Sequence, residues 1–152
     1  QCNGANGKES FCTIMEAVYD EANNTWSTPK AITTTLPDKT DIHHPAVSAD
    51  GMILYFVSKT DGGKGGSDIW MLNKRGTQWE NPTNLGNNVN TEFDEMFPSL
   101  YKDSVLYFAS EGHNGFGGLD IFSSIYNGGW QPAKNLKAPF NSSADDFSIV
   151  FN

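Results

Sequence analysis

The chain has 152 residues and a formal net charge of −8, with ten Lys and Arg against 18 Asp and Glu. This acidic balance excludes the basic face that binding to nucleic acid or to an anionic membrane requires. No apolar run reaches the roughly 18 residues of a membrane-spanning helix, so we also expect no membrane insertion. Many glycines and aromatic residues, without helical periodicity, favour an all-β protein.

An internal repeat organises the chain. Trp26, Trp79 and Trp130 lie 53 and 51 residues apart, and each opens a similar phrase: Trp-Ser-Thr-Pro-Lys, Trp-Glu-Asn-Pro-Thr and Trp-Gln-Pro-Ala-Lys. A period of about 50 residues built from strand patterns is typical of β-propeller blades, each a sheet of four antiparallel strands. The sequence therefore predicts an all-β protein made of propeller blades.

The repeat divides the chain into four segments in order: half a blade over 1–36, complete blades over 45–89 and 98–140, and the first strand of a further blade over 145–152. Turn residues and apolar runs predict strands within these segments. The ranges are 11–19 and 26–32 in the half blade, 53–58 and 68–73 in the first complete blade, and 105–110 and 120–125 in the second.

About two and a half blades do not close a ring, because propellers typically need about four to eight. The chain also begins without Met and in the middle of a blade. We therefore expect it to be a piece of a longer polypeptide, or its ring to be completed by other protein chains.

Two cysteines, Cys2 and Cys12, flank a short polar loop that contains glycine. We predict a disulfide between them, which would indicate a periplasmic or extracellular location. The alternative is two unrelated thiols, with Cys12 buried as a small apolar residue.

Glycine-rich loops at 61–66 and 112–118 precede Asp68 and Asp120. No helix with a Lys-Ser/Thr start follows these loops, so we interpret them as wide hairpin turns in which Gly takes positive φ, and not as phosphate sites. For both aspartates we predict a cap that accepts loop N–H groups, with a calcium ligand as the alternative.

Carboxylates also recur just before the first strand of each blade, as Asp94, Glu95, Asp145 and Asp146 and in the turn 38–41. A catalytic residue is usually needed once per ring. Repetition therefore favours turn capping or bonding between blades, and a calcium or carbohydrate site is the alternative. We expect no catalytic residue, no metal site and no cofactor.

Aromatic residues and histidines complete the set of candidates. Adjacent rings on the second strands, Tyr55 with Phe56 and Tyr107 with Phe108, should face opposite neighbouring blades. By the same reasoning His43 and His44 should point to opposite faces, one packed at a blade edge and the other solvated. The three repeated tryptophans share one position, which favours packing over stacking on a sugar or a partner.

Several phrases carry a family resemblance: Leu-Tyr-Phe-x-Ser, Gly-Gly-x-Gly-Gly, Asp-Ile-aromatic, Trp-x-x-Pro-x-Asn-Leu-Gly and Asn-Thr-x-x-Asp-Glu. Over roughly residues 9–152 the chain resembles the TolB-like β-propeller repeats of Bacteroidota. These repeats occur in OmpA-family envelope proteins associated with peptidoglycan, including a component of the type IX secretion system. The resemblance implies a location in the periplasm or at the outer membrane.

The sequence thus predicts a non-catalytic propeller scaffold for protein–protein interaction in a bacterial envelope. Its expected partners are other protein chains or further blades, within a peptidoglycan-associated or type IX secretion assembly. The alternative is a propeller that binds or processes carbohydrate through loops on one face.

Overall fold

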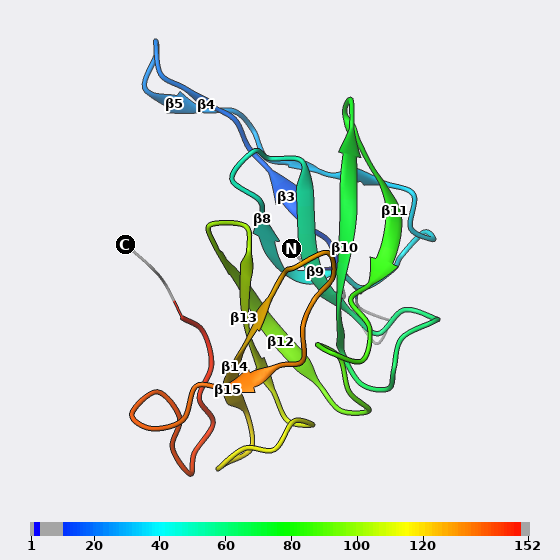
Figure 1. Ribbon diagram of the computed structural model, residues 1–152. Coiled ribbons are helices and arrows are strands. Elements are labelled where there is room, and N and C mark those ends of the chain that lie inside the picture. Colours follow the sequence, from blue (N-terminus) through cyan, green and yellow to red (C-terminus); the bar gives the residue numbers. More distant parts are fainter. Residues whose placement is uncertain (1, 4–10, 150–152) are drawn as a thin grey trace.

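A computed structural model describes residues 2–3 and 11–149 of the chain. Within those residues every regular element is a β-strand (Figure 1). No described segment forms a helix with the length and hydrophobicity needed to cross a membrane. The all-β fold class is therefore confirmed.

The larger sheet holds five strands in the order β7-β11-β10-β9-β8. Four of them form an antiparallel meander: β8 (His43–Val47), β9 (Ile53–Ser58), β10 (Asp68–Arg75) and β11 (Gln78–Asn84). The short strand β7 (Thr33–Thr34) adds to β11 in parallel. Gly76 has a φ of 63° in the tight turn between β10 and β11, a conformation that glycine adopts without steric cost.

The second sheet repeats this meander with four strands in the order β12-β13-β14-β15. They are β12 (Glu95–Tyr101), β13 (Val105–Ser110), β14 (Asp120–Ile125) and β15 (Lys134–Asn135). The ranges predicted for β9, β13 and β14 are confirmed, and β10 extends two residues beyond its predicted end. Continuous apolar runs such as 53–57 predicted them well, because these strands are buried on both faces.

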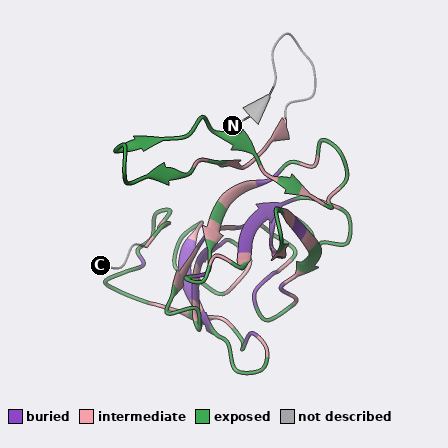
Figure 2. Ribbon diagram, turned by 90° about the horizontal axis from the view of Figure 1, so that it is seen from above, coloured by how far each residue is buried: buried purple, intermediate pink, exposed green. Residues whose placement is uncertain are grey.

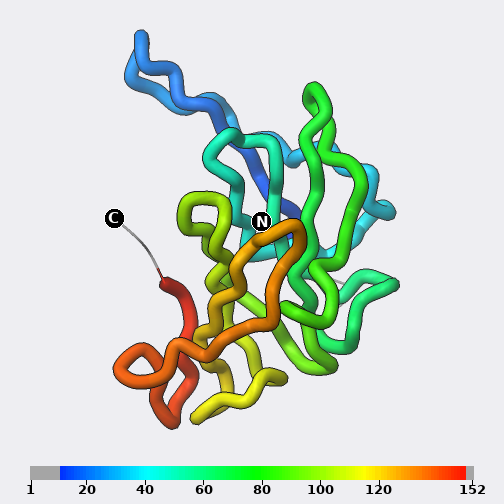
Figure 3. The backbone as a smooth tube through the Cα atoms, viewed as in Figure 1, coloured from blue at the N-terminus to red at the C-terminus, as the bar shows by residue number. Residues whose placement is uncertain are grey.

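The N-terminal part is a long, exposed hairpin that projects from the larger sheet (Figures 1 and 3). Its base pairs β3 (Met15–Glu16) with β6 (Lys30–Ala31), and its tip pairs β4 (Tyr19–Asp20) with β5 (Thr25–Trp26). The two strands predicted at 11–19 and 26–32 are therefore present as interrupted ladders. Beside them β1 (Cys2–Asn3) pairs with β2 (Phe11–Cys12).

The backbone of this last pair places Cys2 directly opposite Cys12. The side chain of Cys2 lies outside the described residues, so the disulfide between the two stays a prediction.

The strand expected over 145–152 is not formed in the described part of that range, 145–149. Residues 150–152 lie outside the described residues. A first strand needs a second strand as its ladder partner, and no described strand lies next to 145–149 in that role. The segment is instead attached through its acidic residues, as described below.

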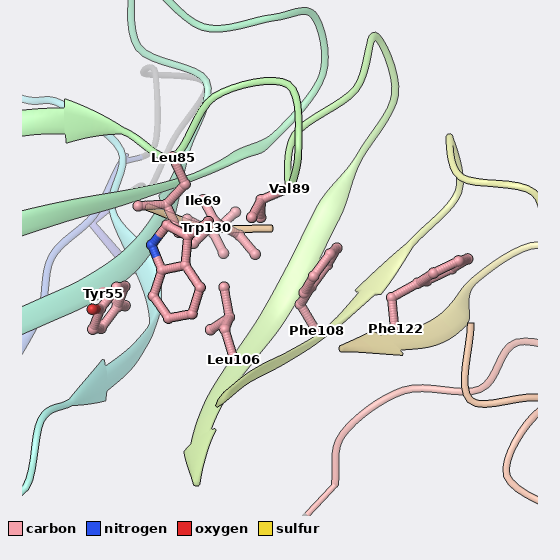
Figure 4. Close-up of a cluster of buried hydrophobic side chains, with 9 residues drawn as sticks. Tyr55, Ile69, Leu85, Val89, Leu106, Phe108, Phe122 and Trp130 are labelled. Atoms are coloured by element: carbon pink, nitrogen blue, oxygen red, sulfur yellow. The ribbon is translucent and has the colours of Figure 1, made fainter. Parts of the chain in front are cut away.

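The two sheets pack face to face over a core contributed by both (Figures 2 and 4). From the larger sheet come Tyr55, Val57 and Ile69 with the following Leu85 and Val89; from the second sheet come Leu106, Phe108, Phe122 and Trp130. The Tyr55 and Trp130 rings meet edge to face, with centroids 6.0 Å apart. This geometry adds to the apolar burial.

The opposite face of the larger sheet carries a second buried cluster. Leu54, Phe56, Trp70, Leu72 and Trp79 pack there with Ile42, and the hairpin covers them with Ile14, Ile32 and Leu36. Tyr55 and Phe56 therefore face different neighbours, as alternation along a strand requires. In the second sheet Phe108 faces the shared core, whereas Tyr107 is only half-buried.

Candidate functional site

The recurring acidic turns lie where one repeat meets the next, and each makes the same pair of bonds. At the seam between the two sheets, Asp94 Oδ1 accepts the Ser67 N–H at 2.6 Å. The N–H of the next residue, Glu95, donates to the Ser67 carbonyl at 2.7 Å. We call this pair the carboxylate staple.

The staple occurs at two further seams. Before the larger sheet, Asp41 Oδ1 accepts the Cys12 N–H at 2.6 Å, and the Ile42 N–H donates to the Cys12 carbonyl at 3.0 Å. After the second sheet, Asp145 Oδ1 and the Asp146 N–H bond Leu119 in the same way, at 3.1 and 2.7 Å. A carboxylate and the backbone of the residue after it thus bind one residue of the preceding repeat.

Hydrogen bonding also sets the charge state of the central staple. Burial opposes ionisation of Asp94, but bonds from Ser67 and the positive charge of Lys59 outweigh it and lower the pKa of Asp94. The Lys59 ammonium lies 3.6 Å from the carboxylate and is largely exposed, so this ion pair contributes little by itself.

Glu95 anchors the start of β12 from inside. Its fully buried carboxylate accepts the Thr91 N–H at 2.7 Å, the Thr91 hydroxyl at 2.6 Å and the Ser110 hydroxyl at 2.7 Å. Burial raises the pKa of Glu95 despite these bonds. In the next repeat Asp146 bonds the N–H and hydroxyl of Ser142.

Glycine-rich loops lie against these acidic turns, and their glycines are needed for a reason different from the predicted one. Only Gly62 in the two loops has a positive φ. A Cβ at Gly65 would overlap the Glu92 carbonyl oxygen, and one at Gly117 would overlap the Ala144 carbonyl oxygen. The prediction of positive φ was therefore wrong for most of the loop glycines. Gly65 and Gly117 instead let two repeats approach closely, whereas Gly63 and Gly115 leave room for the aspartate of their own loop.

The two loop aspartates bond their own loops. Asp68 Oδ2 accepts the Lys64 N–H and, at 2.9 Å, the Asn84 side-chain amide. Asp120 Oδ2 accepts the N–H groups of Phe116 and Gly117 at 2.7 and 3.0 Å. Each Oδ1 is buried without a hydrogen-bond partner in the described part of the chain. Burial, the largest influence, raises the pKa of Asp68 against the bonds from Lys64 and Asn84.

Two buried asparagines clamp the strands that follow these loops, and sequence reasoning gave them no role. The Asn90 amide accepts the Ile69 N–H and donates to the Ile69 carbonyl, both at 2.9 Å. Asn141 does the same to Ile121 at 2.8 Å. Their recurrence 51 residues apart was the signal, but an asparagine near a turn is usually interpreted as a turn residue.

The histidines lie differently from the prediction. A bulge shifts the register between His43 and Ala46, and His44 has a φ of 47°. The two rings therefore meet with centroids 4.5 Å apart and do not point to opposite faces. Both are half-buried, and burial lowers the pKa of each. In the next repeat Phe97 has a similar φ of 53° and stacks on His44 at 4.1 Å.

The tryptophans separate into two environments. Trp79 and Trp130 are buried at the two seams, whereas Trp26 is 69% exposed on the hairpin tip. The packing role predicted for all three therefore does not hold for Trp26 in the described structure.

No described group of three or more His, Cys, Asp or Glu side chains gathers where it could hold a metal ion. Comparison with models of known protein families found no match, and comparison with curated proteins found none either.

Substituting a seam glycine tests whether close approach is its role. Gly65→Ala should lower the free energy of unfolding by about 1 to 3 kcal/mol, because the new Cβ forces the Glu92 backbone away. Gly129→Ala is the matched control: no atom lies within 4 Å of its Cβ position and its φ is not positive. Urea denaturation of both variants measures the difference, and equal effects would contradict the role.

The lowered pKa of Asp94 predicts an acid-dependent contribution. A carboxyl whose folded pKa lies below its unfolded value of about 3.9 stabilises the protein above that pH, and the effect disappears as pH falls through the folded pKa. Wild type should therefore exceed Asp94→Asn by about 1 to 2 kcal/mol near pH 7, and by progressively less below about pH 4. The exposed Asp61→Asn is the control; a pH-independent difference for Asp94→Asn would refute this assignment.

Thermal melting distinguishes a cap from a calcium ligand at Asp68. A cap predicts a small effect for Asp68→Asn, which keeps an acceptor oxygen, and a loss of about 1 to 2 kcal/mol for Asp68→Ala. A chelator should then leave the melting temperatures of wild type, Asp68→Asn and Asp68→Ala nearly unchanged. A large chelator effect confined to wild type would instead indicate a bound cation.

Proposed function

We propose that the chain is part of a β-propeller and serves as a non-catalytic interaction scaffold in a bacterial cell envelope. The observation that carries the proposal is the carboxylate staple, which joins successive repeats at three seams with the same donor and acceptor positions. Units joined repeatedly by one geometry stack with a constant relation to their neighbours, as propeller blades do.

Two further features support a propeller arrangement. The first strands of the two sheets, β8 and β12, contact each other, as innermost strands around an axis would. Both carry a bulge at the same place in the repeat, at His44 and Phe97, and Ser148 has a φ of 68° at the corresponding place. Equivalent bulges bend equivalent strands by the same amount.

The environment of the acidic side chains favours a scaffold. Asp41, Asp94 and Asp145 accept backbone N–H groups of the preceding repeat, and Glu95 is enclosed by Thr91 and Ser110. Carboxylates engaged in this way hold repeats together. The envelope location, with a peptidoglycan-associated or type IX secretion assembly as context, follows from the resemblance to TolB-like repeats.

Glycan binding is a second candidate because of one groove. It lies between the two glycine-rich loops and is lined by Lys64, Asn87, Glu92, Phe93 and His113, among others. The Phe93 ring is 58% exposed, so a sugar could stack on it while the surrounding polar groups bond hydroxyls.

Titration with soluble disaccharide peptides from peptidoglycan distinguishes the scaffold proposal from glycan binding. The protein is isotope-labelled, and binding is followed by the chemical shifts of its amides. The scaffold proposal predicts no saturable shifts. Saturable shifts near Phe93 and His113 that vanish in Phe93→Ala would overturn it in favour of glycan binding. Phe116→Ala is the matched control, because Phe116 is equally exposed and lies outside the groove.

A further inference from the structure

A row of aromatic rings crosses the first strands of successive repeats. The His43 and His44 rings meet edge to face with centroids 4.5 Å apart, and His44 stacks on Phe97 of β12 at 4.1 Å. Phe97 in turn stacks on Phe147 at 5.1 Å. The strands that carry the first three rings, β8 and β12, contact each other. The row therefore lies across the seam between the two sheets.

The two histidines are the members of this row whose charge changes near neutral pH. Both are half-buried, and the Nδ1 atom of each is buried without a hydrogen-bond partner among the described residues. A neutral imidazole can leave Nδ1 unprotonated, but an imidazolium carries a proton there that needs an acceptor. Protonation of both rings would also place two positive charges in direct contact. The row therefore suits neutral histidines and opposes charged ones.

The charges around the two histidines do not reverse this preference. His43 faces the carboxylates of Asp41 and Asp94, which favour its protonation, and the ammonium of Lys59, which opposes it. Both carboxylates already accept backbone N–H groups in their staples. For His44 the charged neighbour is His43 itself. Burial is the largest influence on both rings, and it lowers the pKa of each.

From these contacts we infer that the seam between β8 and β12 is acid-sensitive: neutral His43 and His44 hold it closed, and protonation of the pair separates His44 from Phe97. The face of the Phe97 ring would attract a single imidazolium, but the buried Nδ1 atoms and the second positive charge act against it. The next repeat carries Met96 and Phe97 at the equivalent positions, 53 residues further on. Neither of these side chains titrates, so the sensitivity is specific to the histidine pair.

The effect of acid has a definite direction. Burial holds the folded pKa of each histidine below its unfolded value of about 6.5, so the unfolded chain binds protons first as pH falls. The closed seam therefore stabilises the protein fully above about pH 6.5, and this contribution is lost as pH falls toward the folded pKa values. Each histidine can change the unfolding equilibrium constant by up to about tenfold per pH unit in that window.

Urea denaturation at a series of pH values between about 7.5 and about 5 tests the seam. The double variant His43→Met with His44→Phe installs the residue types that the next repeat carries at the same positions. Between these pH values the unfolding equilibrium constant of wild type should rise on the order of tenfold more than that of the double variant. His113→Gln is the control, because the His113 Nε2 lies 2.8 Å from the Val89 carbonyl oxygen, outside the row. This control should lose stability in acid as wild type does.

Nuclear Overhauser contacts between the His44 and Phe97 rings test the same seam in wild type, without any substitution. They should be strong at about pH 7.5 and disappear as the two imidazoles titrate. If the double variant is poorly folded by near-ultraviolet circular dichroism, His44→Phe alone replaces it and should show a smaller acid response than wild type. Equal acid responses in wild type and the folded variant, or ring contacts that persist after both imidazoles are protonated, would overturn the inference.

Discussion

Asp94 ties two sheets together by accepting the Ser67 N–H, while the N–H of Glu95 returns a bond to the Ser67 carbonyl. This reciprocal pair fixes the first strand of one repeat beside the loop of the previous one. Once it forms, the glycine-rich loop must lie against the acidic turn, and only glycine leaves room for the turn backbone. The apolar faces of the two sheets are then held in contact. The staple therefore determines where the core can form.

Burying several carboxylates has a desolvation cost, which hydrogen bonds from neighbouring groups partly offset. Burial raises the pKa of Asp68 and of Glu95, which shows that desolvation outweighs their hydrogen bonds. For Asp94 the balance is reversed, and its bonds favour the charged form. Protonation of Asp94 in acid should therefore weaken its staple. Protonation of Asp68 and Glu95 should instead remove the desolvation cost of their buried charges. At this seam the glycine-rich loop, the acidic turn and the first strand are held together by hydrogen bonds to the same few carboxylates.

Sequence periodicity predicted the strands well and the details of the seams poorly. Apolar runs such as 53–58 and 105–110 identify buried strands because both faces of each strand need apolar contacts. Periodicity could not show that Gly65 serves close approach, because that depends on a turn 27 residues away. It also could not show that a bulge turns His44 toward His43, since one unusual φ reverses the alternation of side chains. Trp26 shares a repeat position with Trp79, yet it differs in burial because its surroundings differ.

Amide hydrogen exchange measures the staple most directly. The Ser67 and Leu119 N–H groups lie at loop ends and are bonded to the carboxylates of Asp94 and Asp145. If the staple holds the repeats together, both should exchange about as slowly as the amides of β9. Asp94→Ala should then accelerate exchange at Ser67 and loosen that seam first. Exchange at Ser67 as fast as in the exposed hairpin tip, or unchanged by Asp94→Ala, would contradict the account.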